Sequence, residues 1–439
     1  FRTINKKSEF VGWAATTNAF AISTYYAVVF AWVIAMAVFS FKFAGMVGDS
    51  QAASSLFANI TETSWTISGA QIPWVMIIML LVAWTLIYLC IRRGTASVGR
   101  VVKYTGLTLP LLFLIIMAIK GISMPGGMEG IGKLFTPNFA QIIDEGLMSN
   151  LIIDAIGQVF YSLSIMMAIM IAYGSYLSDS ANIAKDATVI AFADLGVSIL
   201  SGIVMFTTMY GVGMTTNDMS ASGIATAFII FPQAIANLTN TGWVNAAFGM
   251  IFYLCLASLA VDSAFSIVEG VSTGVADRFK LNKRKTTMTI CIIAALISLI
   301  FISRSGLAWL DIVDNWTNQY NMIIIGILEC IVVGWILKPT KVLKEVNRNS
   351  LGYKIPKWWF IGSIKFIAPI ALTGFCIWNL YSLFAGGGIY GKESGYPLWS
   401  NIIGGWAVTF LVFVSGFIAK VIINHRKKNG FVDEIKKWD

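Results

Sequence analysis

Four acidic residues lie deep within long apolar stretches of the chain: Asp194, Asp262, Glu269 and Glu329. A carboxylate inside the hydrocarbon layer of a membrane is costly, and it usually serves ion or substrate binding rather than helix packing alone. Ser263 directly follows Asp262. Ser198 lies one helical turn after Asp194, so both would face one side of a helix. Carboxylate and hydroxyl oxygens together suit a small cation such as sodium.

Further polar groups lie in two other apolar stretches. Gln158, Tyr161, Ser162 and Ser164 fall within about one and a half turns of a helix. Their hydroxyls could bond back to helix carbonyls, or they could help ligate a cation. The pair Tyr25–Tyr26 lies halfway along the first stretch, where a phenol either only packs or needs a polar partner.

The composition decides which kind of protein positions these groups. Hydrophobic types make up 57% of the 439 residues and charged types only 12%, against about 25% charged in a soluble domain. Soluble, disordered and nucleic-acid-binding proteins are therefore excluded. The five cysteines have no metal-binding spacing, and the single histidine, His425, lies in a basic tail.

Ten apolar segments are long enough to cross a bilayer, and the lack of strand alternation makes them helices. They are 10–41, 73–91, 101–119, 150–176, 187–214, 242–272, 286–303, 315–337, 357–385 and 397–424. One outer connection, 215–241, contains the apolar stretch Phe228–Pro232, which we expect to pack back onto the protein as a lid or re-entrant piece.

The basic residues alternate between the two sides of this arrangement. Of the 31 Lys and Arg residues, 24 fall in one set of connections and five in the other, and Lys365 and Lys420 lie within spans. Positively charged loops stay in the cytoplasm, so both ends of the chain are predicted to be cytoplasmic. The net charge of +9 is thus a signal of membrane topology, and no nucleic-acid partner is expected beside the lipid bilayer.

Four stretches resemble the neurotransmitter:sodium symporter family, the amino-acid transporters with the LeuT fold. They are Ser23–Tyr26, Gly130–Phe139, Ile153–Ser164 and Asp262–Val271. They occur in the order of the family and on the expected sides of the membrane, and the resemblance covers essentially the whole chain.

The resemblance implies an all-α polytopic fold of inverted repeats, with twelve spans of which these ten would be the third to the twelfth. The first two spans are then expected to precede Phe1. It also implies one transporter domain over 1–439. Within it, 10–119 would end the first repeat, 150–337 would form the second, 357–424 would be two accessory spans, and 425–439 a cytoplasmic tail.

The resemblance also implies roles for individual residues. Tyr26 would hydrogen-bond the substrate carboxylate, and the central pocket would be lined by Ile22, Tyr161, Ser164, Met167 and Ile267. One sodium ion would be held by Ser162 and Asp194, and another by Asp262, Ser263 and the carbonyl of Leu259. An anion site would involve Gln158, Ser162 and Ser198, with Asp314 as the outer-gate acid and Asp277 as the inner-gate acid.

The chain departs from the family pattern at three positions. Asp194 stands where the family usually has asparagine, and Met166 and Ala168 stand where it tends to have glycine. Glycine permits unusual backbone dihedrals, so two larger residues would alter the shape of the pocket. An ionised Asp194 would repel chloride, so we expect that chloride is not required.

The sequence therefore predicts a sodium-coupled symporter of a small neutral amino acid, and not an enzyme. It would act as a monomer or homodimer in a bacterial inner membrane. A proton-coupled or exchanging transporter of the same fold is an alternative that sodium dependence would separate. A non-transporting receptor or partner subunit is another, although the Asp262–Ser263 pair argues against an inactive site.

Overall fold

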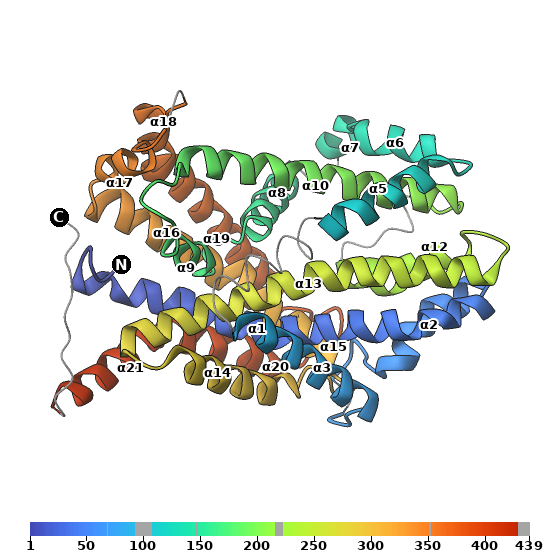
Figure 1. Cartoon of the computed structure of the whole chain (residues 1–439), viewed down its shortest axis with the longest axis horizontal. Helices are drawn as coiled ribbons and strands as arrows, with labels where there is room; N and C mark the ends of the chain where they lie inside the picture. The colour runs from blue at the N-terminus through green and yellow to red at the C-terminus, as the bar shows by residue number, and fades with distance from the viewer. Residues whose placement is uncertain (68, 93–107, 145–147, 216–222, 351–352, 429–439) are drawn as a thin grey trace.

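The computed structural model describes residues 1–67, 69–92, 108–144, 148–215, 223–350 and 353–428 (Figure 1). Within these ranges the regular elements are all helices. In chain order they are η1 (Lys6–Ser8), α1 (Glu9–Val38), η2 (Phe39–Gly45), α2 (Ser50–Thr61), α3 (Trp74–Ile91), α5 (Leu109–Ile122), α6 (Gly127–Phe135), α7 (Phe139–Asp144), α8 (Met148–Ser162), α9 (Ile169–Gly174), α10 (Ile183–Gly211), α11 (Gly223–Ala225), η5 (Thr226–Ile230), α12 (Phe231–Ala236), α13 (Gly242–Phe279), α14 (Lys283–Ser298), α15 (Gly306–Asn315), η6 (Trp316–Asn321), α16 (Met322–Ile331), η7 (Val332–Ile336), α17 (Pro339–Val346), α18 (Lys357–Gly362), η8 (Ser363–Ile367), α19 (Ala368–Ala385), α20 (Leu398–Asn401), η9 (Ile402–Ala407) and α21 (Val408–Lys428).

Seven helices in the described part of the chain are long and apolar enough to cross a membrane, or eight if the bent pair α5–α6 is one span. The ten predicted spans differ from these mainly in continuity. The predicted span 150–176 is broken between α8 and α9, and 286–303 corresponds to α14, which has only 16 residues. The predicted span 101–119 begins in residues that lie outside the described ranges.

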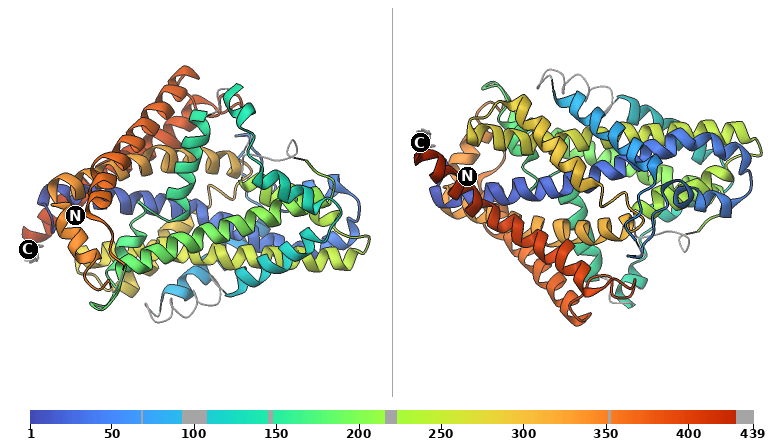
Figure 2. Two further views of the ribbon diagram at one scale, coloured as in Figure 1. Left: turned by 90° about the horizontal axis from the view of Figure 1, so that it is seen from above. Right: turned by 90° about the horizontal axis from the view of Figure 1, so that it is seen from below.

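The centre of the molecule is the antiparallel pair α1 and α13, which lie side by side in Figures 1 and 2. Arg278, near the end of α13, forms an ion pair of 2.6 Å with Glu9 at the start of α1. At the opposite end, a Cβ on Gly242 would lie 2.1 Å from the carbonyl oxygen of Ala44, so only glycine allows this approach. α1 is apolar on all sides, as a helix enclosed by others should be.

The apolar outer segment α11–η5–α12 packs back onto the protein, which confirms the prediction made for 215–241 over its described residues. Phe228 is 1% exposed and stacks on Phe57 with ring centroids 4.6 Å apart. The hydroxyl of Tyr253 donates to the carbonyl oxygen of Ala227 at 2.9 Å. These contacts place the segment against α2 and α13.

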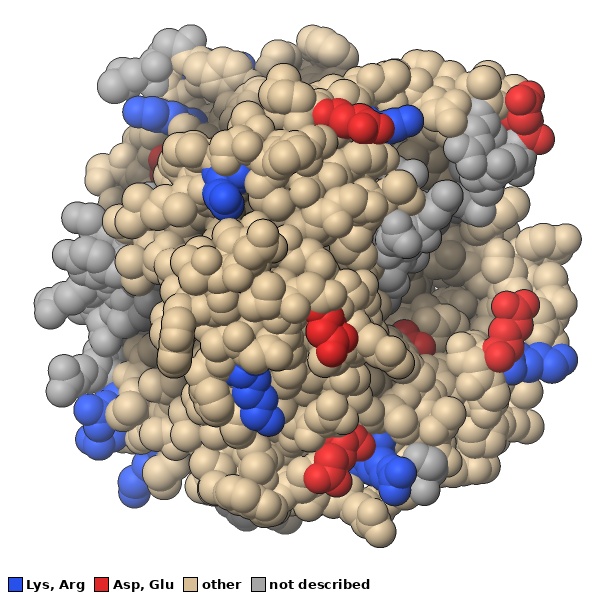
Figure 3. All heavy atoms as spheres, turned by 90° about the vertical axis from the view of Figure 1, so that its right-hand side faces the viewer, with Lys and Arg blue, Asp and Glu red and all other residues tan. Residues whose placement is uncertain are grey.

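The first residue, Phe1, and the end of α21 lie at the same end of the molecule (Figure 1). The guanidinium of Arg426 on α21 donates to the carbonyl oxygen of Phe279 at 2.7 Å, beside the ion pair of Glu9. Figure 3 shows the opposite end, near α2 and α12, where the surface is hollowed and an acidic side chain is visible inside the hollow.

Candidate functional site

A cavity of about 430 Å³ lies between α1, α13 and the broken helix α8–α9. We call it the central cavity. It is lined by Ile22, Tyr26, Tyr161, Ser162, Ser164, Met167, Ile169, Met170, Tyr173, Asp262, Ser263, Ser266 and Ile267. All six residues proposed to bind substrate are in this set, together with three proposed to bind sodium: Ser162, Asp262 and Ser263.

The helix break explains how α8 and α9 reach the cavity. Regular helix stops at Ser162 and resumes at Ile169. Backbone groups freed at such a break need other partners, and mid-membrane breaks of this kind are where transporters bind their ligands. The break includes Met166 and Ala168, the two positions at which the family tends to have glycine.

Asp194 on α10 does not line the central cavity but reaches it through a hydrogen bond. The hydroxyl of Ser162, at the end of α8, donates to the Oδ2 carboxylate oxygen of Asp194. Two of the residues predicted to share a sodium ion are thus in direct contact, and they join α8 to α10.

At the other side of the cavity, Asp262, Ser263 and Ser266 present oxygen atoms from one face of α13. The hydroxyl of Ser266 lies 2.5 Å from that of Tyr173, which follows the break on α9. A carboxylate and several hydroxyls around one space form a hard donor set that fits a small cation. Leu259 lies one turn before Ser263 on α13 and is not among the residues lining the cavity.

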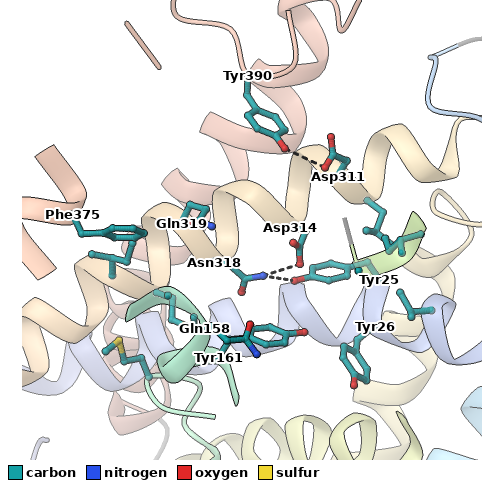
Figure 4. A pocket seen from close by; sticks show the side chains of 18 of the residues that line it. Tyr25, Tyr26, Gln158, Tyr161, Asp311, Asp314, Asn318, Gln319, Phe375 and Tyr390 are labelled. Atoms are coloured by element: carbon teal, nitrogen blue, oxygen red, sulfur yellow. Dashed lines mark hydrogen bonds between the residues drawn. The ribbon is translucent and has the colours of Figure 1, made fainter. Parts of the chain in front are cut away.

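A second cavity, of about 700 Å³, lies on the side of α2 and α12 and is called the outer cavity (Figure 4). Tyr26 and Tyr161 line both cavities, so these two side chains form the wall between them. Gln158 faces the outer cavity, one turn before Ser162.

Asp314, the predicted outer-gate acid, lines the outer cavity and accepts a hydrogen bond from Asn318, which the sequence did not single out. Asn318, one turn later, donates to Oδ1 of Asp314 at 2.7 Å (Figure 4). The same amide donates to the hydroxyl of Tyr25 at 3.5 Å, and that hydroxyl lies 3.3 Å from Thr317. Tyr25 therefore has polar partners, which excludes the packing-only interpretation.

A loop after α19 is fastened to the mouth of the outer cavity. Tyr390 donates a hydrogen bond of 3.1 Å to Oδ1 of Asp311 (Figure 4). Tyr396 donates one of 3.0 Å to Oδ2 of the same carboxylate. Burial, with the nearby Asp311 carboxylate, raises the pKa of both tyrosine hydroxyls, so both remain protonated donors. The sequence carried no signal for this contact, because 79 residues separate Asp311 from Tyr390.

A third cavity, of about 250 Å³, lies on the side of Phe1 and is called the inner cavity. Asp277, the predicted inner-gate acid, lines it. Nearby, the buried carboxylate of Glu269 accepts a hydrogen bond from Tyr176 at 2.7 Å and forms an ion pair with Lys283. Glu269 therefore cross-links α13, the turn after α9 and the start of α14.

Comparison with known proteins shows the family to which this chain belongs. The model of the sodium:neurotransmitter symporter family matches residues 55–427, which is most of the chain. The chain belongs to this family. It is consequently a polytopic all-α membrane protein with the LeuT fold, a transporter and not an enzyme.

The named relatives within the symporter family are sodium-dependent transporters. An uncharacterized sodium-dependent transporter of Methanocaldococcus jannaschii is 29% identical over 99% of this chain and 84% of its own length. A sodium- and chloride-dependent glycine transporter 2 of Xenopus laevis is 26% identical over 76% of this chain. A sodium- and chloride-dependent creatine transporter 1 of Bos taurus is 27% identical over 77%. The chain aligns with 42% and 54% of the lengths of these two animal relatives.

The three residues of the predicted anion site do not line one common space in the structure. Gln158 faces the outer cavity and Ser162 the central cavity, while Ser198 is exposed one turn beyond Asp194 on α10. The oxygen that Ser162 approaches is the carboxylate of Asp194. A carboxylate oxygen of Asp194 therefore lies beside Ser162, a residue that would contact the anion.

Proposed function

We propose that the protein is a sodium-coupled symporter that carries a small neutral amino acid by alternating access. The observation that carries the proposal is the composition of the central cavity. Its wall joins the phenol of Tyr26, suited to a substrate carboxylate, with the Asp262–Ser263 pair, suited to sodium.

The cavity walls favour a small, uncharged side chain on the substrate. Ile22, Met167 and Ile267 supply apolar surface and are 0–3% exposed. The volume of about 430 Å³ is near the lower end of the roughly 300–1,000 Å³ found for small-molecule sites. In this proposal Asp262, the acid lining this cavity, binds the co-transported ion rather than a charged substrate.

Sodium supplies the driving force in this proposal. A sodium ion that moves down the membrane potential releases about 2.3 kcal/mol per 100 mV. Binding of sodium and substrate would stabilise a closed form in which Tyr26 and Tyr161 seal the central cavity from the outer one. Opening on the side of the inner cavity would then release both to the cytoplasm.

The test is uptake of radiolabelled alanine by the purified full chain in vesicles, with and without an inward sodium gradient. Wild-type uptake should depend on sodium, and Asp262→Ala should lower sodium-stimulated uptake about 100-fold because an essential ligand is lost. Asp179→Ala, which changes an exposed loop carboxylate, is the matched control and should transport normally. Asp262→Asn keeps the shape of the side chain and should also be inactive.

Two results would contradict the proposal. Uptake driven by a proton gradient or by counter-substrate, and indifferent to sodium, would favour the proton-coupled or exchanging alternative. Asp262→Ala with unchanged sodium dependence would remove this residue from the ion site.

A further inference from the structure

The break between α8 and α9 contains three non-glycine residues with left-handed backbone. The φ angles are +52° at Ser164, +66° at Met166 and +61° at Ala168. Residues with a Cβ adopt this region at a cost of roughly 1–2 kcal/mol each. Such a conformation persists only where surrounding contacts determine it, so some contact must hold this segment in place.

Three successive residues of the break line three different cavities. Met166 faces the outer cavity, Met167 the central cavity and Ala168 the inner cavity. The short segment therefore borders all three spaces, beside the wall that Tyr26 and Tyr161 form between the outer and central cavities. A rotation of its backbone at one residue would redirect the neighbouring side chains, including the two that line the central cavity, Ser164 and Met167.

The side chain of Met166 packs against α16. Its side chain is 7% exposed, and its sulfur lies over the bare backbone of Gly326. A Cβ at Gly326 would lie 2.3 Å from this sulfur and 2.5 Å from the terminal methyl of Met166. The same Cβ would lie 3.3 Å from Leu372 on α19, which closes the other side.

Gly326 has no local reason to be glycine. It lies in the middle of α16 and does not have a positive φ. Glycine inside a helix is less stable than alanine by about 1 kcal/mol, so a glycine there usually serves packing. Here the missing side chain leaves the space that the end of Met166 occupies.

We propose that Met166 is a positioning residue for substrate selection: seated on Gly326, it fixes the helix break and thereby the direction in which Met167 and Ser164 enter the central cavity. The proposal rests on the proposed function, because it concerns which amino acids that cavity accepts. It assigns selectivity to a residue that does not itself line the central cavity.

The experiment compares four proteins: wild type, Gly326→Ala, Met166→Ala and the double variant. The first measurement is the ratio of kcat/KM for alanine to that for leucine in sodium-driven uptake. Gly326→Ala should shift this ratio about tenfold, the scale of a one-methylene change in a pocket, because the displaced side chain turns the break. In the double variant the new methyl fills part of the space that the thioether vacates, so the ratio should return towards wild type.

Gly374→Ala is the matched control. Gly374 lies inside α19, and a Cβ there would meet no atom within 4 Å. It should leave the ratio unchanged and so separate the contact with Met166 from a general effect of alanine on helices.

The second measurement needs no substrate. Ser164→Cys is added to each protein, and the rate of labelling by a membrane-impermeant thiol reagent is measured over the background of the native cysteines. Gly326→Ala should change this rate, and adding Met166→Ala should restore it. If no amino acid is transported at all, the proposed function fails while the labelling still tests the position of the break.

The inference is overturned if Gly326→Ala behaves like Gly374→Ala in both measurements. It is also overturned if Gly326→Ala lowers uptake of alanine and leucine equally, or if Met166→Ala fails to correct it. Met166→Ala alone is an independent test, because it removes the contact with Gly326 without adding a clash. It should also shift the ratio of kcat/KM for alanine to that for leucine.

Discussion

The hydrogen bond from Ser162 to Asp194 bears directly on the ions that the protein uses. The hydroxyl of Ser162 donates to a carboxylate oxygen of Asp194, which is a hydrogen-bond acceptor at this point. The family usually has an uncharged asparagine here, so this chain has a fixed acidic group close to both the central cavity and the predicted anion site.

We therefore predict that transport needs no chloride. Replacing chloride by gluconate should leave wild-type uptake unchanged, whereas Asp194→Asn should become either chloride-responsive or inactive. Asp186→Asn, an exposed acid in the first turn of the same helix, is the control and should behave as wild type. A several-fold loss of wild-type uptake in gluconate would show that the carboxylate does not replace the anion.

The position of Met167 leads to a second prediction, about the size of the substrate. It lines the central cavity and is 3% exposed, so it limits the space for a substrate side chain. Alanine and valine should compete for uptake more strongly than tryptophan, and Met167→Ala should improve competition by larger amino acids roughly tenfold. Met128→Ala, at an exposed methionine of α6, should change nothing. Stronger competition by tryptophan in the wild type would refute a compact site.

At the scale of elements, the loop between α19 and α20 is attached to α15 by side chains rather than by backbone. Tyr396 supplies one of the two bonds to Asp311. Tyr396→Phe should destabilise the protein by about 1.5–3 kcal/mol, as expected for a lost hydrogen bond to a charged group. Thermal unfolding in detergent measures this effect.

The same variant should expose the loop to proteolysis. Trypsin can cleave after Lys392, which lies between the two tyrosines, so cleavage should become faster when Tyr396 no longer holds the loop. Tyr381→Phe, at an exposed position of α19, is the control. Equal cleavage rates in both variants would mean that the bond to Asp311 does not restrain the loop.

The elements also show how much the sequence could predict. Charged and hydroxyl residues in apolar stretches, with the family motifs, led to the residues that now line the central cavity. The contacts of Asn318 and Tyr390 could not be foreseen, because they depend on which helices and loops meet in space. The left-handed φ of Met166 was also not foreseen, since a residue with a Cβ argues against that conformation until a contact such as Gly326 is known.

At the scale of the whole molecule, Phe1 and the end of α21 lie at the same end of the structure. The inner cavity, which Phe1 helps to line, is on this side. We predict that this end is cytoplasmic, as the distribution of basic residues indicates. An epitope tag after residue 439 should be stained only in permeabilised cells. A tag inserted at Asn240, in the loop before α13, should be accessible in intact cells, and the opposite pattern would reverse the orientation.

The arrangement of the break has a consequence for the electric field across the membrane. If water fills the outer and inner cavities, each conducts ions and carries little of the voltage. The potential would then fall mainly across the few ångströms of protein around Met166, Met167 and Ala168, which separate those spaces. A sodium ion crossing that short distance would gain nearly the full 2.3 kcal/mol per 100 mV. The voltage dependence of transport would then arise mainly in the one step in which the ion passes these three residues.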